Sequence, residues 1–164
     1  MTRKMDKCKL MMPMLLVFLF PAFFFIAGCS SVVDPNDLQT VENNVLIIPD
    51  LIHYFEKNKI PIDKVELIRA DVAHANDAVA IKIAGREIGI YKYNVNIRKQ
   101  REKLAHIETE KFLYLVGIKC NVLINGSFVM VGWEGNPQKE LLAKVFMSFS
   151  PKSVNNSEAS TIKR

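Results

Sequence analysis

The pattern of apolar and polar positions predicts two β-hairpins in the middle of the chain, each followed by a helix. In the first hairpin, residues 78–93, an Ala84-Gly85 loop places Lys82 opposite Glu87, a favourable pair of charges across the strands. A loop one residue longer would break this pair and mix the two faces, so the two-residue register is favoured. One face of the hairpin is then apolar and consists of Val79, Ile81, Ile83, Ile88 and Ile90.

The second hairpin, residues 112–133, is apolar on both faces near its turn. Asn125-Gly126 is a strong signal for a type I′ turn. One face comprises Ile118, Cys120, Val122, Ile124, Val129, Val131 and Trp133. The opposite face carries Leu123, Phe128 and Met130, and without a covering helix these would form an exposed apolar patch of the kind that marks partner contact. They are therefore a candidate partner surface.

Helices and one further strand complete the prediction. Pro49 in a first-turn position opens a helix that runs to about residue 58, and residues 65–69 read as a strand. Residues 96–111 are a charged, mostly solvated helix with an Arg98–Glu102 pair one turn apart. Asn136, followed by Pro137, caps the last helix. The apolar face of that helix consists of Leu141, Leu142, Val145, Phe146 and Phe149.

Together these elements predict an α+β fold, a mainly antiparallel sheet built from two hairpins with helices packed on it. The similar spacing of hairpin and helix leaves open an arrangement of two ββα units side by side. In that arrangement Ile88, Ile90 and Leu104 of the first unit match Val129, Val131 and Val145 of the second.

Residues 1–28, which precede this domain, have the layout of an export signal. Arg3, Lys4, Lys7 and Lys9 come before an uncharged run from residue 10 to residue 27. The run ends on Ile26-Ala27-Gly28-Cys29, which resembles the lipobox of bacterial lipoproteins. The resemblance implies cleavage between Gly28 and Cys29 and covalent attachment of a diacylglycerol and an N-acyl chain to Cys29.

Two alternatives stay open for this stretch, a transmembrane anchor and a cleaved signal without lipid. A spanning helix needs about 20 apolar residues, and here Pro13 and Pro21 interrupt a run that is slightly short. A plain secretory signal would not need Cys29. The positive N-terminus stays in the cytoplasm in either membrane reading, so the body lies in the cell envelope. By the same resemblance, Ser30 and Ser31 favour the outer membrane, facing the periplasm, in a bacterium that has two membranes.

The chain after the signal divides into three parts. Residues 29–45 are the lipidated N-terminus and a polar tether, residues 46–149 form the single α+β domain, and residues 150–164 are a polar tail without period, predicted to be disordered.

Charge and cysteine content narrow the functional classes. Four of the 22 Lys and Arg residues and one of the 17 Asp and Glu residues lie in the signal, so the net charge falls from +5 to +2 on cleavage. A nearly neutral domain gives no electrostatic case for nucleic acid. Cys8 leaves with the signal and Cys29 carries lipid, so Cys120 alone remains and no disulfide can form within the mature chain.

Three features could carry chemistry, and each has a simpler structural interpretation. Cys120 is a potential nucleophile, but its apolar strand neighbours favour a core position. Asp71, His74 and Asp77 could hold a metal or exchange protons, but they lie in a connection between strands, where a capped turn is simpler. The basic residues of the charged helix, with Lys92 nearby, could contact anionic lipid, although Glu102, Glu108 and Glu110 dilute them and favour a solvated helix.

No catalytic residue, metal ligand or cofactor is therefore assigned, apart from the lipid on Cys29. The sequence predicts a non-enzymatic envelope lipoprotein whose small domain binds another envelope component, a protein partner being one possibility. The alternative is an envelope enzyme that uses Cys120 or the Asp71/His74/Asp77 cluster.

Overall fold

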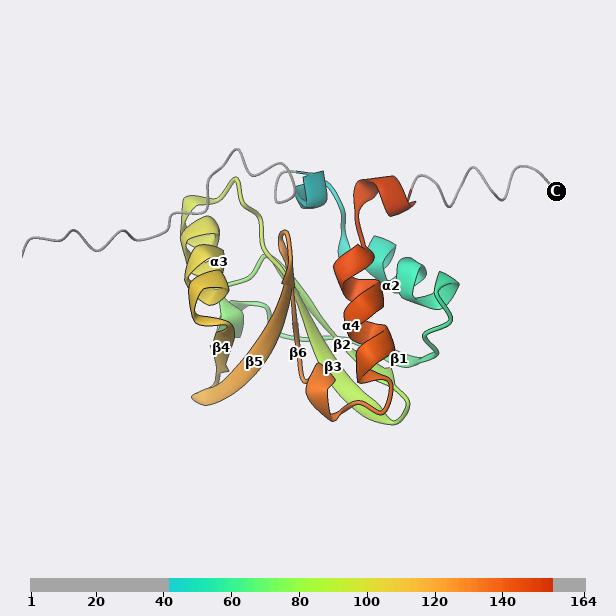
Figure 1. Ribbon diagram of the computed structural model, residues 1–164. Helices are drawn as coiled ribbons and strands as arrows, with labels where there is room; N and C mark the ends of the chain where they lie inside the picture. Colours follow the sequence, from blue (N-terminus) through green and yellow to red (C-terminus); the bar gives the residue numbers. More distant parts are fainter. Residues whose placement is uncertain (1–41, 155–164) are drawn as a thin grey trace, which may run out of the picture. The chain divides into compact units, whose positions relative to one another are not determined.

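Six antiparallel strands form one sheet in the order β1-β2-β3-β6-β5-β4 (Figure 1). The computed structural model describes residues 42–154, so the predicted signal peptide and Cys29 lie outside the described residues. Two three-stranded meanders meet where β3 pairs with β6. This arrangement confirms the predicted α+β class with an antiparallel sheet. The strands are β1 (Ile62–Leu67), β2 (Asp77–Ile83), β3 (Arg86–Lys92), β4 (Phe112–Leu115), β5 (Ile118–Asn125) and β6 (Phe128–Val131).

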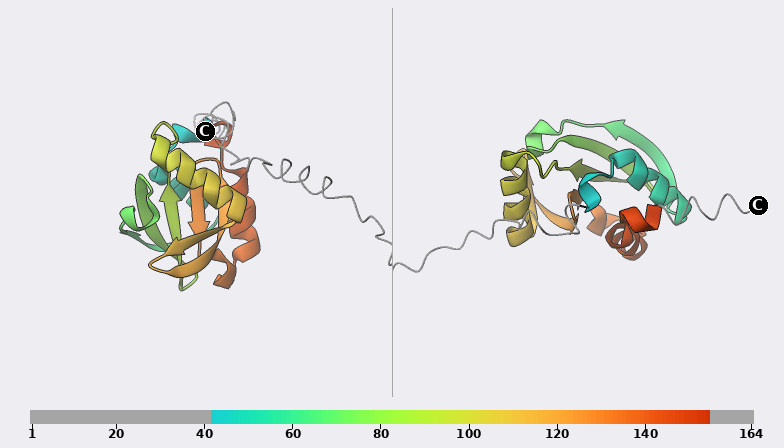
Figure 2. Two further views of the ribbon diagram at one scale, coloured as in Figure 1. Left: turned by 90° about the vertical axis from the view of Figure 1, so that its left-hand side faces the viewer. Right: turned by 90° about the horizontal axis from the view of Figure 1, so that it is seen from above.

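Helices cover both faces of the sheet (Figure 2). Helices α2 (Ile48–Lys57) and α4 (Lys139–Ser148) pack on one face, and α3 (Arg98–Glu110) packs on the other. Two short 3₁₀ turns, η1 (Asp71–Ala73) and η2 (Trp133–Gly135), lie in the connections. Within residues 42–154, no helix is long and apolar enough to cross a membrane.

Helices α3 and α4 lie on opposite faces of the sheet, so the two predicted ββα units are not packed in the same way. Each unit contains a third strand. The residues that the sequence comparison placed in equivalent positions of the two units point to opposite faces of the sheet. Ile88 and Ile90 lie in the core beneath α2 and α4, whereas Val129 and Val131 lie in the core beneath α3. The two halves therefore share an order of elements but not a common packing.

The first hairpin has the predicted register. Lys82 pairs with Glu87, and Ile83 pairs with Arg86 across a two-residue loop. Ala84 and Gly85 both take positive φ, +50° and +75°, as a type I′ turn requires. The predicted apolar face of this hairpin is buried in the core beneath α2 and α4.

The second hairpin has its loop one residue later than predicted. Asn125 pairs with Phe128, so the loop is Gly126-Ser127, and Gly126 takes φ +55° at the first loop position, as in a type II′ turn. The strand partners shift by two residues, so the predicted faces of β5 and β6 are kept. Trp133 is the exception, because it follows the end of β6 and packs against the core beneath α2 and α4.

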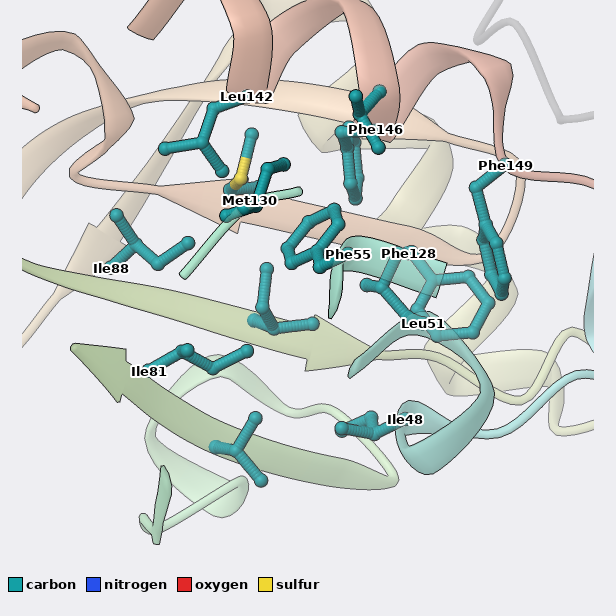
Figure 3. Close-up of a cluster of buried hydrophobic side chains, with 14 of the residues drawn as sticks. Ile48, Leu51, Phe55, Ile81, Ile88, Phe128, Met130, Leu142, Phe146 and Phe149 are labelled. Atoms are coloured by element: carbon teal, nitrogen blue, oxygen red, sulfur yellow. The ribbon is translucent and has the colours of Figure 1, made fainter. Parts of the chain in front are cut away.

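The prediction that Leu123, Phe128 and Met130 form an exposed partner surface is wrong. Phe128 and Met130 are fully buried, and Leu123 is partly buried against the same core. Figure 3 shows Phe128 and Met130 among side chains of α2 and α4, with the Phe128 ring edge-on to the Phe149 ring at a centroid distance of 5.4 Å. The last helix covers this face of the hairpin, so the face is part of the interior.

The folded domain is longer at both ends than residues 46–149. Residues 42–44 form a helical turn in which Asn43 is fully buried. After α4, the amide of Val154 donates to the Ser150 carbonyl at 3.1 Å, and Val154 packs on the core. The folded domain thus begins no later than residue 42, within the predicted tether, and the beginning of the predicted tail is folded.

The start of α4 also differs from the prediction. The helix begins at Lys139, and Asn136 lies before it, with Oδ1 accepting from the Gln138 amide at 2.9 Å. The Asn136 Nδ2 donates to the Ile83 carbonyl at 2.9 Å. Asn136 therefore fastens this connection to the first hairpin instead of capping the helix directly.

Candidate binding sites at the two ends of the sheet

Asp71, His74 and Asp77 do not form a joint site, because each residue has its own local role. Asp71 accepts two hydrogen bonds from the Arg69 guanidinium, at 3.1 and 2.5 Å, and this contact lowers the pKa of Asp71. His74 ends η1 with φ +56°, and Asp77 Oδ1 accepts from the Ala78 amide at 2.8 Å. In the described part of the chain, no three His, Cys, Asp or Glu side chains are grouped closely enough to hold a metal ion.

Cys120 is half-buried on β5, where it packs against the core beneath α3. Its thiol contacts the Ile118 carbonyl, with Sγ 3.7 Å from the oxygen. No imidazole is hydrogen-bonded to this sulfur among residues 42–154. The thiol thus has apolar neighbours, as predicted, although it is less deeply buried than a core residue.

Lys92 is the one charged residue buried in the described domain. It was predicted to lie near the basic residues of the charged helix instead. Its Nζ donates to the Asn43 carbonyl at 2.8 Å and to the Ser127 hydroxyl, and it lies 4.4 Å from the centroid of the Phe128 ring. Burial lowers the pKa of Lys92 to about 7. The ammonium fixes the first described residues to the β5–β6 turn.

Asparagine side chains extend this network. Asn43 Nδ2 donates to Asn125 Oδ1 at 2.9 Å, and Asn125 Nδ2 donates to the Phe146 and Phe149 carbonyls at 2.6 and 2.8 Å. Asn43 Oδ1 is buried and accepts no hydrogen bond from any described residue. The network closes the end of the sheet where the described chain begins.

An exposed apolar hairpin tip lies at the other end of the sheet. The loop between β4 and β5 is Val116-Gly117, and both residues have positive φ, +50° and +83°. Val116 is 85 % exposed, and its neighbours Tyr114 and Ile118 are 53 % and 67 % exposed. A β-branched residue in this backbone region is a genuine outlier. We name Tyr114, Val116, Gly117 and Ile118 the hairpin tip.

The two ends are well separated. Asn125, which contacts Asn43, is the last residue of β5, and Ile118 is the first. Seven residue steps along a strand cover about 24 Å. The hairpin tip therefore lies far from the point where the described chain begins, as the ribbon also shows (Figure 1).

A pocket of about 310 Å³ opens beside the Lys92 network. Its polar lining comes from Asn44, Asn76, Asp77, Asn94 and Asn96, and its apolar wall from Leu46, Ile47 and Ile48. We call it the amide pocket. Its residues come from three segments: the first described turn with the start of α2, the start of β2, and the end of β3 with its connection to α3.

A second, more open hollow of about 380 Å³ is lined by Trp133, Glu134, Lys139, Glu140 and Ala143. The Glu134 carboxylate already accepts the Asn121 side-chain amide, at 3.1 and 3.2 Å. Trp133 Nε1 is buried without a hydrogen-bond partner among the described residues, which leaves the indole as a packing group here.

Neither the hairpin tip nor the amide pocket was predicted from the sequence. The tip had a weak signal, a valine and a glycine between two apolar runs. The pocket had none, because its asparagines are spread over 53 positions from residue 44 to residue 96. Comparison with protein families, with curated proteins and with solved structures finds no match to this chain.

Proposed function

We propose that this protein is a lipid-anchored, non-enzymatic module of the bacterial cell envelope that binds a protein partner through its hairpin tip. The anchor is the lipid on Cys29 that the lipobox-like sequence implies. The binding surface is the tip, in place of the buried Leu123, Phe128 and Met130.

The observation that carries the proposal is the conformation and exposure of Val116. Local stability favours Asn or Gly at a loop position with positive φ, and contact with water favours a polar side chain. Val116 satisfies neither preference, since its φ is +50° and it is 85 % exposed. Residues held in such backbone regions cluster at functional sites, and an apolar side chain there is well placed to be buried by a partner.

The structure around the tip favours a protein as that partner. β4 is an outer strand of the sheet, so one row of its main-chain groups has no strand beside it in the described domain. An extended segment of another protein can pair with such an edge. Lys119, whose Nζ lies 3.9 Å from the centroid of the Phe112 ring, adds a positive charge next to the apolar side chains.

The position of the tip is compatible with an anchor at Cys29. Thirteen residue steps separate Cys29 from Glu42, where the described chain begins. A chain of this length reaches at most about 45 Å. The lipid thus keeps the domain near the membrane, while the tip, at the end of the sheet away from residue 42, is available to a neighbouring protein.

Photo-cross-linking in intact cells tests the proposal. A photoreactive amino acid is placed at Val116 and, as a matched control, at Leu67, which is also 85 % exposed but lies on β1 at the opposite edge of the sheet. We expect a discrete cross-linked product from position 116 that is absent from position 67 and disappears when Ile118→Ser is added. Equal products from both positions, or none from 116, would contradict a docking tip.

A further inference from the structure

We infer that the amide pocket binds an uncharged, hydroxyl-rich ligand, that is, a saccharide. This site is separate from the hairpin tip, and the inference does not depend on the proposed protein partner. It rests on which polar groups line the pocket and on which of them the protein itself already uses.

Several amide groups in the pocket make no hydrogen bond to any residue of the described part of the chain. Asn76 and Asn96 are exposed, and their side chains make no hydrogen bond within the described domain. Asn44 and Asn94 each use only Oδ1, which accepts from the Val95 amide at 3.2 Å and from the Asn96 amide at 3.0 Å. Their NH₂ groups stay available as donors.

The chemistry of these groups matches hydroxyls. A carboxamide donates and accepts hydrogen bonds, and so does a hydroxyl, so neighbouring carboxamides can satisfy neighbouring hydroxyls of one ligand. Asp77 adds an acceptor, since only its Oδ1 is used, by the Ala78 amide. Ile47, 55 % exposed at the rim, offers an apolar surface for the C–H face of a sugar ring.

The charges in the pocket argue against an anionic ligand. Lys92 belongs to the lining, but its Nζ is directed to Asn43, Ser127 and the Phe128 ring. No other Lys or Arg lines the pocket, and the Asp77 carboxylate would repel a phosphate or carboxylate. The volume of about 310 Å³ lies at the lower end of the range of roughly 300–1,000 Å³ typical of ligand pockets.

The test is a titration of the full-length, ¹⁵N-labelled protein in micelles of a zwitterionic detergent that carries no sugar. The probes are the neutral disaccharides chitobiose, cellobiose and maltose, with two charged comparisons, the anion glucose 6-phosphate and the zwitterion dialanine. The readout is the chemical shifts of the side-chain NH₂ groups, with Asn121, which lies outside the pocket, as internal reference.

We expect at least one disaccharide to shift the Asn76 and Asn96 signals saturably and to leave Asn121 unchanged. Because a neutral hydrogen bond contributes about 0.5–1.5 kcal/mol, Asn76→Ala or Asn96→Ala should weaken binding roughly 3- to 10-fold, while Asn121→Ala should not. No saturable shift with any neutral disaccharide would overturn the inference. So would stronger binding of the charged probes, or shifts confined to the indole N–H signal of Trp133 in the second hollow.

Discussion

Asn43 Nδ2 donates to Asn125 Oδ1 at 2.9 Å, although 82 positions separate the two residues. This bond joins the first described turn to the end of β5, and Asn125 continues the connection to the carbonyls of Phe146 and Phe149 at the end of α4. Both ends of the domain are thus fastened to one asparagine. The same contact explains why Asn125 is the last residue of β5 and why the loop is Gly126-Ser127 instead of the predicted Asn125-Gly126.

Replacement of Asn125 should therefore be costly. Asn125→Ala leaves the buried Phe149 carbonyl and the Asn43 amide without their partner, and the Phe146 carbonyl keeps only the Phe149 amide, at 3.2 Å. Each lost buried bond costs about 1–3 kcal/mol. We expect the free energy of unfolding to fall by about 3 kcal/mol or more in urea denaturation. The same change at Asn121, which is hydrogen-bonded to Glu134 at the surface, serves as control and should cost less than about 1 kcal/mol. Equal losses would contradict the role of Asn125.

Two loop glycines form a matched pair for a second prediction. A Cβ at Gly126 would lie 2.7 Å from Asn43 Nδ2 and 2.8 Å from Asn43 Cβ, whereas a Cβ at Gly85 meets nothing within 4 Å. Both residues have positive φ, so both Ala variants carry backbone strain, which is about 1–2 kcal/mol at Gly85 and larger at Gly126, the first position of a type II′ turn. Overpacking adds about 1–3 kcal/mol at Gly126 alone. Thermal unfolding should rank Gly126→Ala clearly below Gly85→Ala, and the reverse order would show that Asn43 does not pack there.

The buried Lys92 predicts that stability depends on pH. Burial lowers its pKa from 10.5 to about 7, so between pH 7 and 10 the unfolded chain holds a proton that the folded domain has released. The free energy of unfolding therefore rises with pH across this window, by at most about 1.4 kcal/mol per unit. Above this window, the raised pKa values of Tyr91 and Tyr93 act in the opposite direction.

Urea denaturation at pH 7 and pH 9 measures this effect. We expect wild type to gain on the order of 2 kcal/mol between the two values. Lys92→Met should remove most of the gain, and Lys99→Met, on the exposed side of α3, should retain it. An unchanged gain in Lys92→Met would show that another group titrates.

The strain at Val116 predicts a stabilising substitution. Val116→Asn creates the Asn-Gly pair that a loop with two positive φ angles favours, and should raise the free energy of unfolding by about 1 kcal/mol. The control is Leu67→Asn, equally exposed but in ordinary strand backbone, which should be neutral or slightly destabilising. If Val116→Asn also lost stability, the valine would not be strained.

The features of the fold that depend on local sequence patterns were predicted correctly. The Lys82–Glu87 register follows from alternation and a two-residue loop, and the helix beginning near Pro49 follows from its start signal and apolar face. The predictions were wrong where contacts between residues far apart in the sequence determine the structure. Asn43 belongs to the domain because Lys92 and Asn125 bind it, and Phe128 is interior because α4 covers it. Neither contact has a signal in the neighbouring sequence.

The candidate sites show the same division. The lipobox-like stretch is contiguous and could be identified from the sequence. The amide pocket joins three separate segments, and the strain at Val116 is a property of φ, not of residue order. Sites of these two kinds become visible only in three dimensions.

The proposed function depends first on Cys29, and mass spectrometry of the protein purified from membranes of its host tests this directly. We expect a mature chain that begins at Cys29 and carries a diacylglycerol and an N-acyl chain, whereas Cys29→Ala should remain uncleaved and without lipid. Alkaline hydrolysis should remove the ester-linked acyl chains from the wild type. A chain that still begins at Met1, or one cleaved at Cys29 without added mass, would contradict a lipid-anchored envelope module.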